Sequence, residues 1–152
     1  MSIVYRIDKE KGFTAVLWDG VVTADAFLAH VRRLSADADW PPPRRLHLSD
    51  LRTTSLDASM DEATIEKAAE IYANQQNKIA GMKVAIVAGE PFNKAVIFER
   101  AISRYGASAI VFNFPNIACK WLNIIGDEVA HALQQLRDQL RGGKKSPRGG
   151  RP

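Results

Sequence analysis

The sequence has 152 residues, of which 46% are hydrophobic and 25% are charged, and its formal net charge at pH 7 is +4. These proportions are typical of one globular domain and exclude a collagen-like or largely disordered chain. The apolar stretches are far shorter than the roughly 20 residues that span a bilayer. Cys119 is the only cysteine, which excludes an intramolecular disulfide or a cysteine-rich zinc site.

The first residues, MSIVYRIDKEKG, are charged where a signal peptide needs an apolar segment. Together with the cysteine count, this predicts a cytoplasmic protein.

The positive charge is concentrated at the C-terminal end. Residues 141–152, RGGKKSPRGGRP, contain five basic residues and no acidic one, so subtracting these five charges from +4 leaves −1 for residues 1–140. We expect a domain over residues 1–140 and a flexible basic tail over residues 141–152. Such a tail could make weak, sequence-independent contact with nucleic acid or an anionic surface, or could only keep the protein in solution.

The N-terminal third of the chain predicts a β-hairpin, a helix and a strand. IVYRID alternates in polarity and FTAVLWDG follows after a short polar connection, which favours an antiparallel pair ending at Gly20. Thr23 is placed to cap a helix, which must end before WPPPRR because prolines remove backbone donors. RRLHLSD then predicts a short third strand that ends at Asp50, followed by a loop over residues 49–59.

The remaining residues predict helices that alternate with strands. An S-x-x-E pattern beginning at Ser59 is typical of a capping box at the start of a second helix. MKVAIVAG predicts a strand buried on both faces, Pro91 and Gly106 bracket a third helix, and SAIVFNF predicts a fifth strand. Two further helices follow, the first opened by Pro115 and the second capped by Asp127.

The order of these elements predicts an α/β fold with a single mixed five-stranded sheet. An N-terminal hairpin is followed by alternating units whose parallel strands are joined by right-handed crossovers, with the helices packed against the sheet. The last helix carries an apolar stripe formed by Val129, Leu133, Leu136 and Leu140. This stripe either packs on its own sheet or joins two copies of the chain in a homodimer.

The loop after the third strand holds the first group of candidate site residues, because ligand and partner sites favour the carboxyl ends of parallel strands. The group consists of Asp50, Arg52, Thr53, Thr54 and Ser55. Asp50 and Arg52 could orient a polar ligand or pair with each other. The hydroxyls lie before a helix start, where a phosphate would be stabilised, but they are equally typical of an ordinary turn.

Two later strand ends supply the second group of candidates. Phe92 and Asn93 follow the predicted fourth strand, and Asn113 and Phe114 follow the fifth. These side chains could line an apolar pocket at the end of the sheet, or the phenylalanines could belong to the core.

Common enzyme and metal-site motifs are missing from the sequence. There is no phosphate-binding glycine loop and no nucleophile elbow. The three histidines, His30, His47 and His131, are far apart and none has the spacing of a metal-binding motif. The sequence therefore predicts a protein without metal or cofactor that acts by binding.

Several stretches carry a family resemblance. They are VLWDGVVTADAFLAHV, LHLSDLR, MKVAIVAGEPFNKAVIFERA and VFNFPNIACKWL, which lie within residues 3–125. On these stretches the chain resembles the SpoIIAA-like group of bacterial proteins, related in fold to STAS domains, the anti-sigma factor antagonists, and to Sec14-type lipid-binding domains. The resemblance implies a non-enzymatic regulatory domain that binds a protein partner. The alternative that it implies is a small-molecule or lipid-binding module with an apolar pocket at the strand ends.

The same resemblance bears on the loop after the third strand. Antagonist STAS domains carry an Asp-Ser-Ser-type motif there, in which a serine is phosphorylated. In this chain Asp50 is followed by Leu51 and Arg52, so the expected serine is absent at both following positions. Thr53 to Ser55 come later and could substitute, but the departure favours a loop that shapes the turn and caps the helix.

Overall fold

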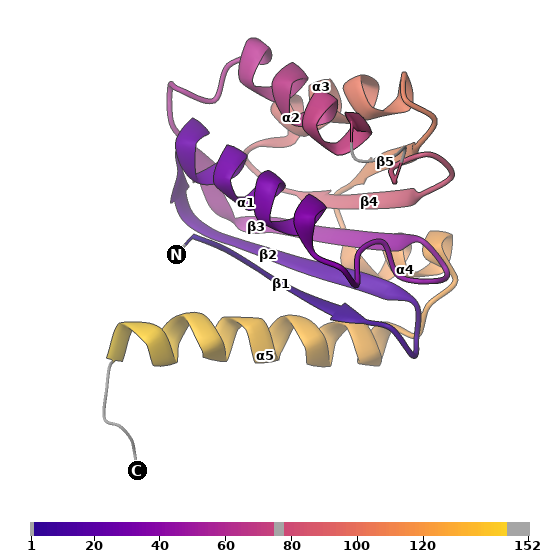
Figure 1. Cartoon of the computed structure of the whole chain (residues 1–152). Helices are drawn as coiled ribbons and strands as arrows, with labels where there is room; N and C mark the ends of the chain where they lie inside the picture. The colour runs from indigo at the N-terminus through magenta and orange to yellow at the C-terminus, as the bar shows by residue number, and fades with distance from the viewer. Residues whose placement is uncertain (1, 75–77, 146–152) are drawn as a thin grey trace.

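A computed structural model of the chain describes residues 2–74 and 78–145 (Figure 1). Within these residues, strands and helices follow one another in the order that the sequence predicts. In chain order they are β1 (Ile3–Asp8), β2 (Phe13–Val22), α1 (Ala24–Ala36), β3 (Leu46–Leu56), α2 (Glu62–Asn74), β4 (Lys83–Ala88), α3 (Phe92–Ser103), β5 (Ser108–Phe112), α4 (Pro115–Leu122) and α5 (Gly126–Lys145). The predicted α/β fold is confirmed.

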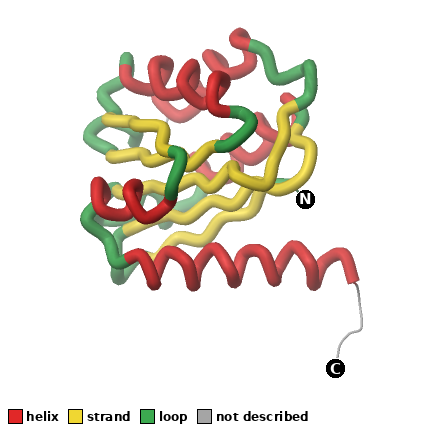
Figure 2. Tube along the Cα trace, turned by 180° about the vertical axis from the view of Figure 1, so that it is seen from behind, coloured by secondary structure: helices red, strands yellow, loops and turns green. Residues whose placement is uncertain are grey.

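The strands form one mixed sheet whose spatial order is the order along the chain, β1-β2-β3-β4-β5. β1 and β2 are antiparallel and the remaining pairs are parallel. Because every parallel connection is a crossover to the next strand in the same direction, α1, α2 and α3 all lie on one face. α4 and α5 cover the other face, with α5 running along one side of the sheet (Figures 1 and 2).

Two separate apolar cores follow from this arrangement, one on each face of the sheet. The core under α1, α2 and α3 is rich in aromatic residues, among them Trp18, Phe27, Trp40 and Tyr72. The core under α4 and α5 is made mainly of aliphatic side chains, such as Leu48 and Leu133. We call these sides of the sheet the three-helix face and the two-helix face.

The third strand is longer than predicted, and most of the expected loop over residues 49–59 is strand. β3 continues to Leu56 because its second half pairs with β2, where Thr54 lies opposite Gly20 and Leu56 lies opposite Val22. The second strand is likewise longer than predicted. It passes through Gly20, which has a φ of +73°, and ends at Val22.

A β-bulge explains why the polarity of β3 misled the sequence prediction. Opposite Trp18 of β2, β3 has two residues, Leu51 and Arg52, in place of one. The extra residue shifts the alternation of side chains by one position. As a result Leu51 and Leu56, which are five residues apart, both pack on the three-helix face.

The helix starts partly match the prediction. Thr23 caps α1, since its hydroxyl oxygen accepts a hydrogen bond from the Ala26 backbone N–H at 3.1 Å. α2 is capped by Asp61 instead of Ser59, because the Asp61 carboxylate accepts a hydrogen bond from the Thr64 backbone N–H at 2.9 Å. The Ser59 hydroxyl oxygen instead accepts a hydrogen bond from the backbone N–H that begins α1.

The last helix packs on the protein's own sheet. Its apolar stripe is buried in the core of the two-helix face, so these side chains are not left to join a second copy. The helix begins at Gly126, which places Asp127 in the first turn instead of at the cap. It continues to Lys145, into the segment predicted as a tail, and residues 146–152 of that segment lie outside the described residues.

Candidate functional site

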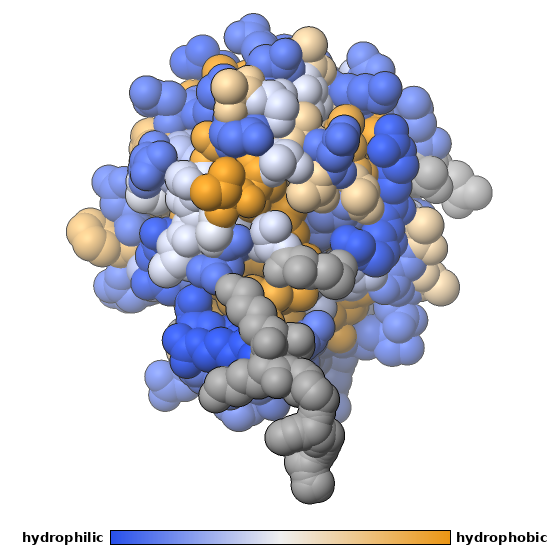
Figure 3. Space-filling model, turned by 90° about the vertical axis from the view of Figure 1, so that its left-hand side faces the viewer, coloured by the Kyte–Doolittle hydropathy of each residue, from blue (hydrophilic) through white to orange (hydrophobic). Residues whose placement is uncertain are grey.

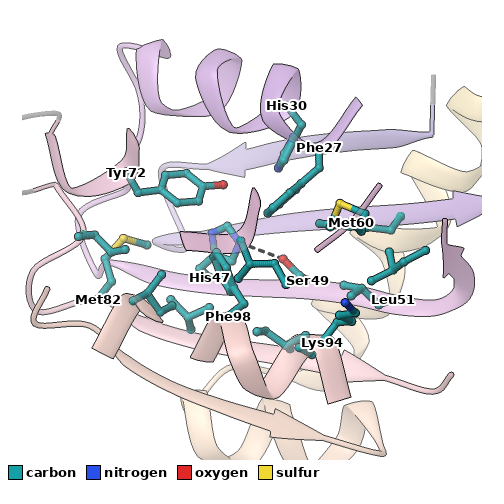
Figure 4. Close-up of a pocket in the computed structure, with 18 of the residues that line it drawn as sticks. Phe27, His30, His47, Ser49, Leu51, Met60, Tyr72, Met82, Lys94 and Phe98 are labelled. Atoms are coloured by element: carbon teal, nitrogen blue, oxygen red, sulfur yellow. Dashed lines mark hydrogen bonds between the residues drawn. The ribbon is translucent and has the colours of Figure 1, made fainter. Parts of the chain in front are cut away.

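A cavity lies between the sheet and the helices of the three-helix face (Figure 4). Its volume is about 60 Å³, which is room for about four water molecules. It is lined by Trp18, Phe27, His30, Trp40, His47, Ser49, Leu51, Leu56, Met60, Ile65, Tyr72, Ile79, Met82, Val84, Ile86, Lys94, Ala95, Phe98 and Ile102. The lining comes from all three helices of this face, from β2, β3 and β4, and from the connections between them.

Five of the 19 lining residues are phenylalanine, tyrosine or tryptophan, and their rings pack edge to face or at a tilt. The ring centroids of Trp18 and Phe27 are 5.1 Å apart, those of Trp40 and Tyr72 are 5.3 Å apart, and those of Tyr72 and Phe98 are 6.3 Å apart. Such rings offer flat apolar surface with fixed orientation. Two methionines, Met60 and Met82, add flexible side chains that can adapt to an occupant.

Two buried histidines give the cavity its polar character. His47 Nε2 lies 3.1 Å from Ser49 Oγ, both on β3, while His30 reaches the cavity from α1. Figure 4 shows the hydroxyl of Tyr72 pointing toward the space between these two imidazoles.

Burial keeps both histidines neutral at pH 7. It lowers the pKa of His47 to about 4. It also lowers the pKa of His30 to about 3, with smaller contributions from His47 and Arg33. A neutral imidazole carries one donor and one acceptor, so each ring can hydrogen-bond in either sense. Burial also raises the pKa of Tyr72, which keeps its hydroxyl protonated.

Most of the unpartnered buried polar atoms of the protein belong to this lining. Among the described residues, five buried side-chain nitrogen or oxygen atoms have no hydrogen-bond partner. Four of the five belong to lining residues: Trp18 Nε1, His30 Nδ1, Trp40 Nε1 and His47 Nδ1. Leaving a buried donor or acceptor unpaired costs about 1–3 kcal/mol, so such atoms are rare and each one calls for a reason.

The cavity opens toward the surface at one side. Fifteen of its lining residues are buried, and the half-buried exceptions are Ser49, Leu56, Lys94 and Phe98. Figure 4 places Lys94 at the same end as Leu51 and Met60, away from Tyr72 and Met82. The side chain of Lys94 thus stands at the mouth.

The charge at the mouth is positive and is not neutralised by the lining. Within residues 2–74 and 78–145, no aspartate or glutamate lines the cavity. Across the described part of the chain, Lys94 forms no ion pair within 4.0 Å. Lys94 contributes to the lowered pKa of Asp61, which is caused mainly by hydrogen bonds from Thr64.

The structure places the first group of predicted site residues along β3. Asp50 is 1% exposed and forms a bidentate ion pair with Arg52, with Nε to Oδ1 at 2.9 Å and Nη2 to Oδ2 at 2.8 Å. The two side chains thus pair with each other. Thr54 is buried and donates its hydroxyl hydrogen to the Gly20 carbonyl at 2.6 Å. Thr53 is exposed and Ser55 is half-buried, and none of these five residues lines the cavity.

The second group of predicted residues also lies away from the cavity. Phe92 is half-buried and packs against the core of the three-helix face, while Asn93 and Asn113 are exposed. Phe114 is 60% exposed. The strand order never reverses, so this sheet has no switch-point crevice at its strand ends. The cavity instead lies under the helices.

The residues that form the cavity carried only a weak signal in the sequence. His30 falls on the buried stripe of α1, between Phe27 and Leu34, and His47 falls between two leucines of a strand. A histidine at a core position needs a partner, and two of them on neighbouring elements could have indicated a polar cavity.

No protein-family model matches the chain, and neither does the sequence of any curated protein. The chemistry of the site therefore has to be argued from its own residues. No helix within residues 2–74 and 78–145 is both long enough and apolar enough to cross a membrane. In the same residues, no group of three or more histidine, cysteine or acidic side chains is placed to hold a metal ion.

Proposed function

We propose that this protein is a binding module that holds a small, mainly apolar molecule with hydrogen-bonding groups in the cavity of the three-helix face. The observation that carries the proposal is the location of the four unpartnered polar atoms on residues of one cavity lining. The indole nitrogens of Trp18 and Trp40 can only donate, and each has less than 1 Å² of accessible surface, so an occupant with acceptor oxygens would complement them once neighbouring side chains move.

The unpartnered polar atoms distinguish this cavity from a packing defect. A void lined only by apolar groups loses contacts, but it leaves no donor or acceptor unsatisfied. Here each unpaired group costs about 1–3 kcal/mol, and an occupant that hydrogen-bonds to it recovers this free energy on binding. A site that is destabilising when empty and stabilised by its occupant is the expected design for ligand binding.

The resemblance to the SpoIIAA-like group bears on both candidate functions. It implies a regulatory domain that binds a protein partner, and its relationship to Sec14-type domains implies, as the alternative, a ligand pocket. We extend the proposal to a cytoplasmic protein that binds its ligand without transforming it. The pocket that we propose lies between the sheet and the helices.

A regulatory role through a protein partner is the second candidate. Large apolar side chains are exposed at or next to α4, namely Phe114, Ile117 and Ile125. Figure 3 shows a further gathering of apolar side chains at the centre of a mostly hydrophilic face. Exposed apolar surface is typical of contact sites between proteins. If the cavity binds no small molecule, regulation through a protein partner becomes the leading interpretation.

The test of ligand binding uses 3-phenylpropanamide, a neutral probe with one ring and one amide. We expect saturable binding at one site per chain by isothermal titration calorimetry, with a Kd of about 1 mM or tighter for a molecule of this size. Fluorescence gives a second measurement in a Trp121→Phe variant, because the two remaining tryptophans, Trp18 and Trp40, both line the cavity.

Two serines on β3 provide a matched pair of variants. Ser49→Leu fills the mouth of the cavity and should weaken probe binding at least tenfold, whereas Ser55→Leu adds the same bulk outside the lining and should leave binding unchanged. Circular dichroism confirms that both variants fold. The proposal is wrong if the probe does not saturate, or if both variants bind it as the wild type does.

A further inference from the structure

We propose that the ligand is an aromatic carboxylic acid, with its ring inside the cavity and its carboxylate on Lys94 at the mouth. This inference rests on the proposed function and names the class of ligand. It follows from three features of the lining: a neutral interior, a single cation at the opening, and five aromatic side chains among the walls.

The interior of the cavity cannot favour an ion of either sign. The two histidines are neutral at pH 7 because burial lowers the pKa of each. No carboxylate lines the cavity. A buried charge without a charged or strongly hydrogen-bonded partner is unfavourable, so the part of the ligand that lies deep in the cavity is neutral.

The opening differs from the interior, because Lys94 is the only charged residue among the described residues that line the cavity. It sits in the first turn of α3, half-buried, with no carboxylate within 4.0 Å among the described residues. A half-buried ammonium at the edge of an apolar cavity can pair with an anionic group of the occupant by a charge-assisted hydrogen bond. The ligand therefore carries its negative charge at the end that faces the mouth.

The shape of the interior favours a flat ring over an alkyl chain. Five of the lining residues are phenylalanine, tyrosine or tryptophan: Trp18, Phe27, Trp40, Tyr72 and Phe98. Aromatic rings gain more from packing against such walls than their buried area alone provides. The 60 Å³ volume is smaller than a benzene-sized cavity, so Met60 and Met82 must shift as the ring enters.

An aromatic cage can also bind a cation, so the charge at the mouth decides whether the ligand is a cation or an anion. Cages that hold ammonium groups use ring faces to attract positive charge. Here Lys94 would repel a cation at the opening, and no carboxylate in the lining would compensate for it. The positive mouth therefore selects an anion.

The test compares 3-phenylpropionate with 3-phenylpropanamide, which has the same size and no charge. We expect the carboxylate to bind about tenfold more tightly than the amide at low ionic strength, and this ratio to shrink as salt is added. In Lys94→Gln the ratio should fall to about one, and Lys94→Arg should retain most of it. Lys120→Gln is the matched control, because it removes an exposed lysine from α4 on the opposite face.

The outcomes separate this inference from the proposed function. If the amide binds in the cavity but the carboxylate binds no tighter, or if Lys94→Gln leaves the ratio unchanged, the ligand class is wrong and the binding function stands. If octanoate binds more tightly than 3-phenylpropionate, the aromatic part of the inference is wrong. If neither phenyl probe binds, the binding function itself fails and the inference fails with it.

Discussion

The two faces of the sheet differ in the side chains that cover them and in how fully these side chains pack. On the two-helix face, aliphatic side chains fill the space between the sheet and α4 and α5. On the three-helix face, aromatic and aliphatic side chains and two histidines surround a cavity, and four of the five unpartnered buried polar atoms of the described residues belong to its lining. Both faces bury an apolar core, but the three-helix face leaves part of its packing and of its hydrogen bonding unsatisfied.

The largest expected effect that tests this comparison is the loss of stability in mild acid. The pKa of His30 is lowered to about 3 and that of His47 to about 4, whereas an unfolded histidine titrates near 6.5. The unfolded state thus binds more protons below pH 6.5, so the stability that comes from these groups is complete above that pH and falls as the pH drops toward 4. At pH 5 we expect each histidine to lower the free energy of unfolding by roughly 2 kcal/mol relative to pH 7.

Urea unfolding at pH 7, 6 and 5 measures this effect. His30→Gln should remove about half of the pH dependence, while His131→Gln, which changes an exposed histidine of α5, should leave it intact. Equal stability at pH 7 and pH 5 would show that the cavity histidines are already accessible to protons in the folded protein.

A smaller effect on stability is expected from truncating two leucines of β3, one on each face of the sheet. Leu48 is 0% exposed and packs on the two-helix face, whereas Leu51 is 5% exposed and lines the cavity. Leu48→Ala should lower the free energy of unfolding by about 3 kcal/mol, because it opens a new void among packed side chains. Leu51→Ala should cost about half as much, because Leu51 already lacks neighbours on its cavity side.

Chemical denaturation of the two variants at pH 7 checks this prediction. The two substitutions remove the same atoms from the same strand, so the difference between their unfolding free energies reports the packing of the two faces. Equal losses would mean that the three-helix face is packed as tightly as the other.

The sequence predicted the fold better than it predicted the site, for a physical reason. Strand and helix periodicities are local, so the hairpin, the buried fourth strand and the alternating units could all be read from neighbouring residues. The second half of β3 could not, because the bulge opposite Trp18 breaks the period-two pattern and the polar residues around Arg52 then resemble a turn.

The cavity was beyond local reasoning because its lining is spread from Trp18 to Ile102. Each of its aromatic and aliphatic residues looks like an ordinary core residue in the sequence, and only the packed structure shows where these side chains fail to meet. The prediction of a site in the loops at the strand ends rests on an analogy with doubly wound sheets. In this sheet the strand order never reverses, so the analogy does not apply.

The smallest expected effect concerns a single unpaired donor. Trp40 is 3% exposed, and its indole N–H has no acceptor among the described residues. Trp40→Phe removes that donor, which recovers about 1–3 kcal/mol, but it also loses apolar contacts of a similar worth. We therefore expect the free energy of unfolding to stay within about 0.5 kcal/mol of the wild type. A loss of stability of about 1–3 kcal/mol would mean that this N–H is already hydrogen-bonded, because its removal would then leave a buried acceptor unpaired. The three-helix face would then have one fewer unpaired polar atom that a ligand could satisfy.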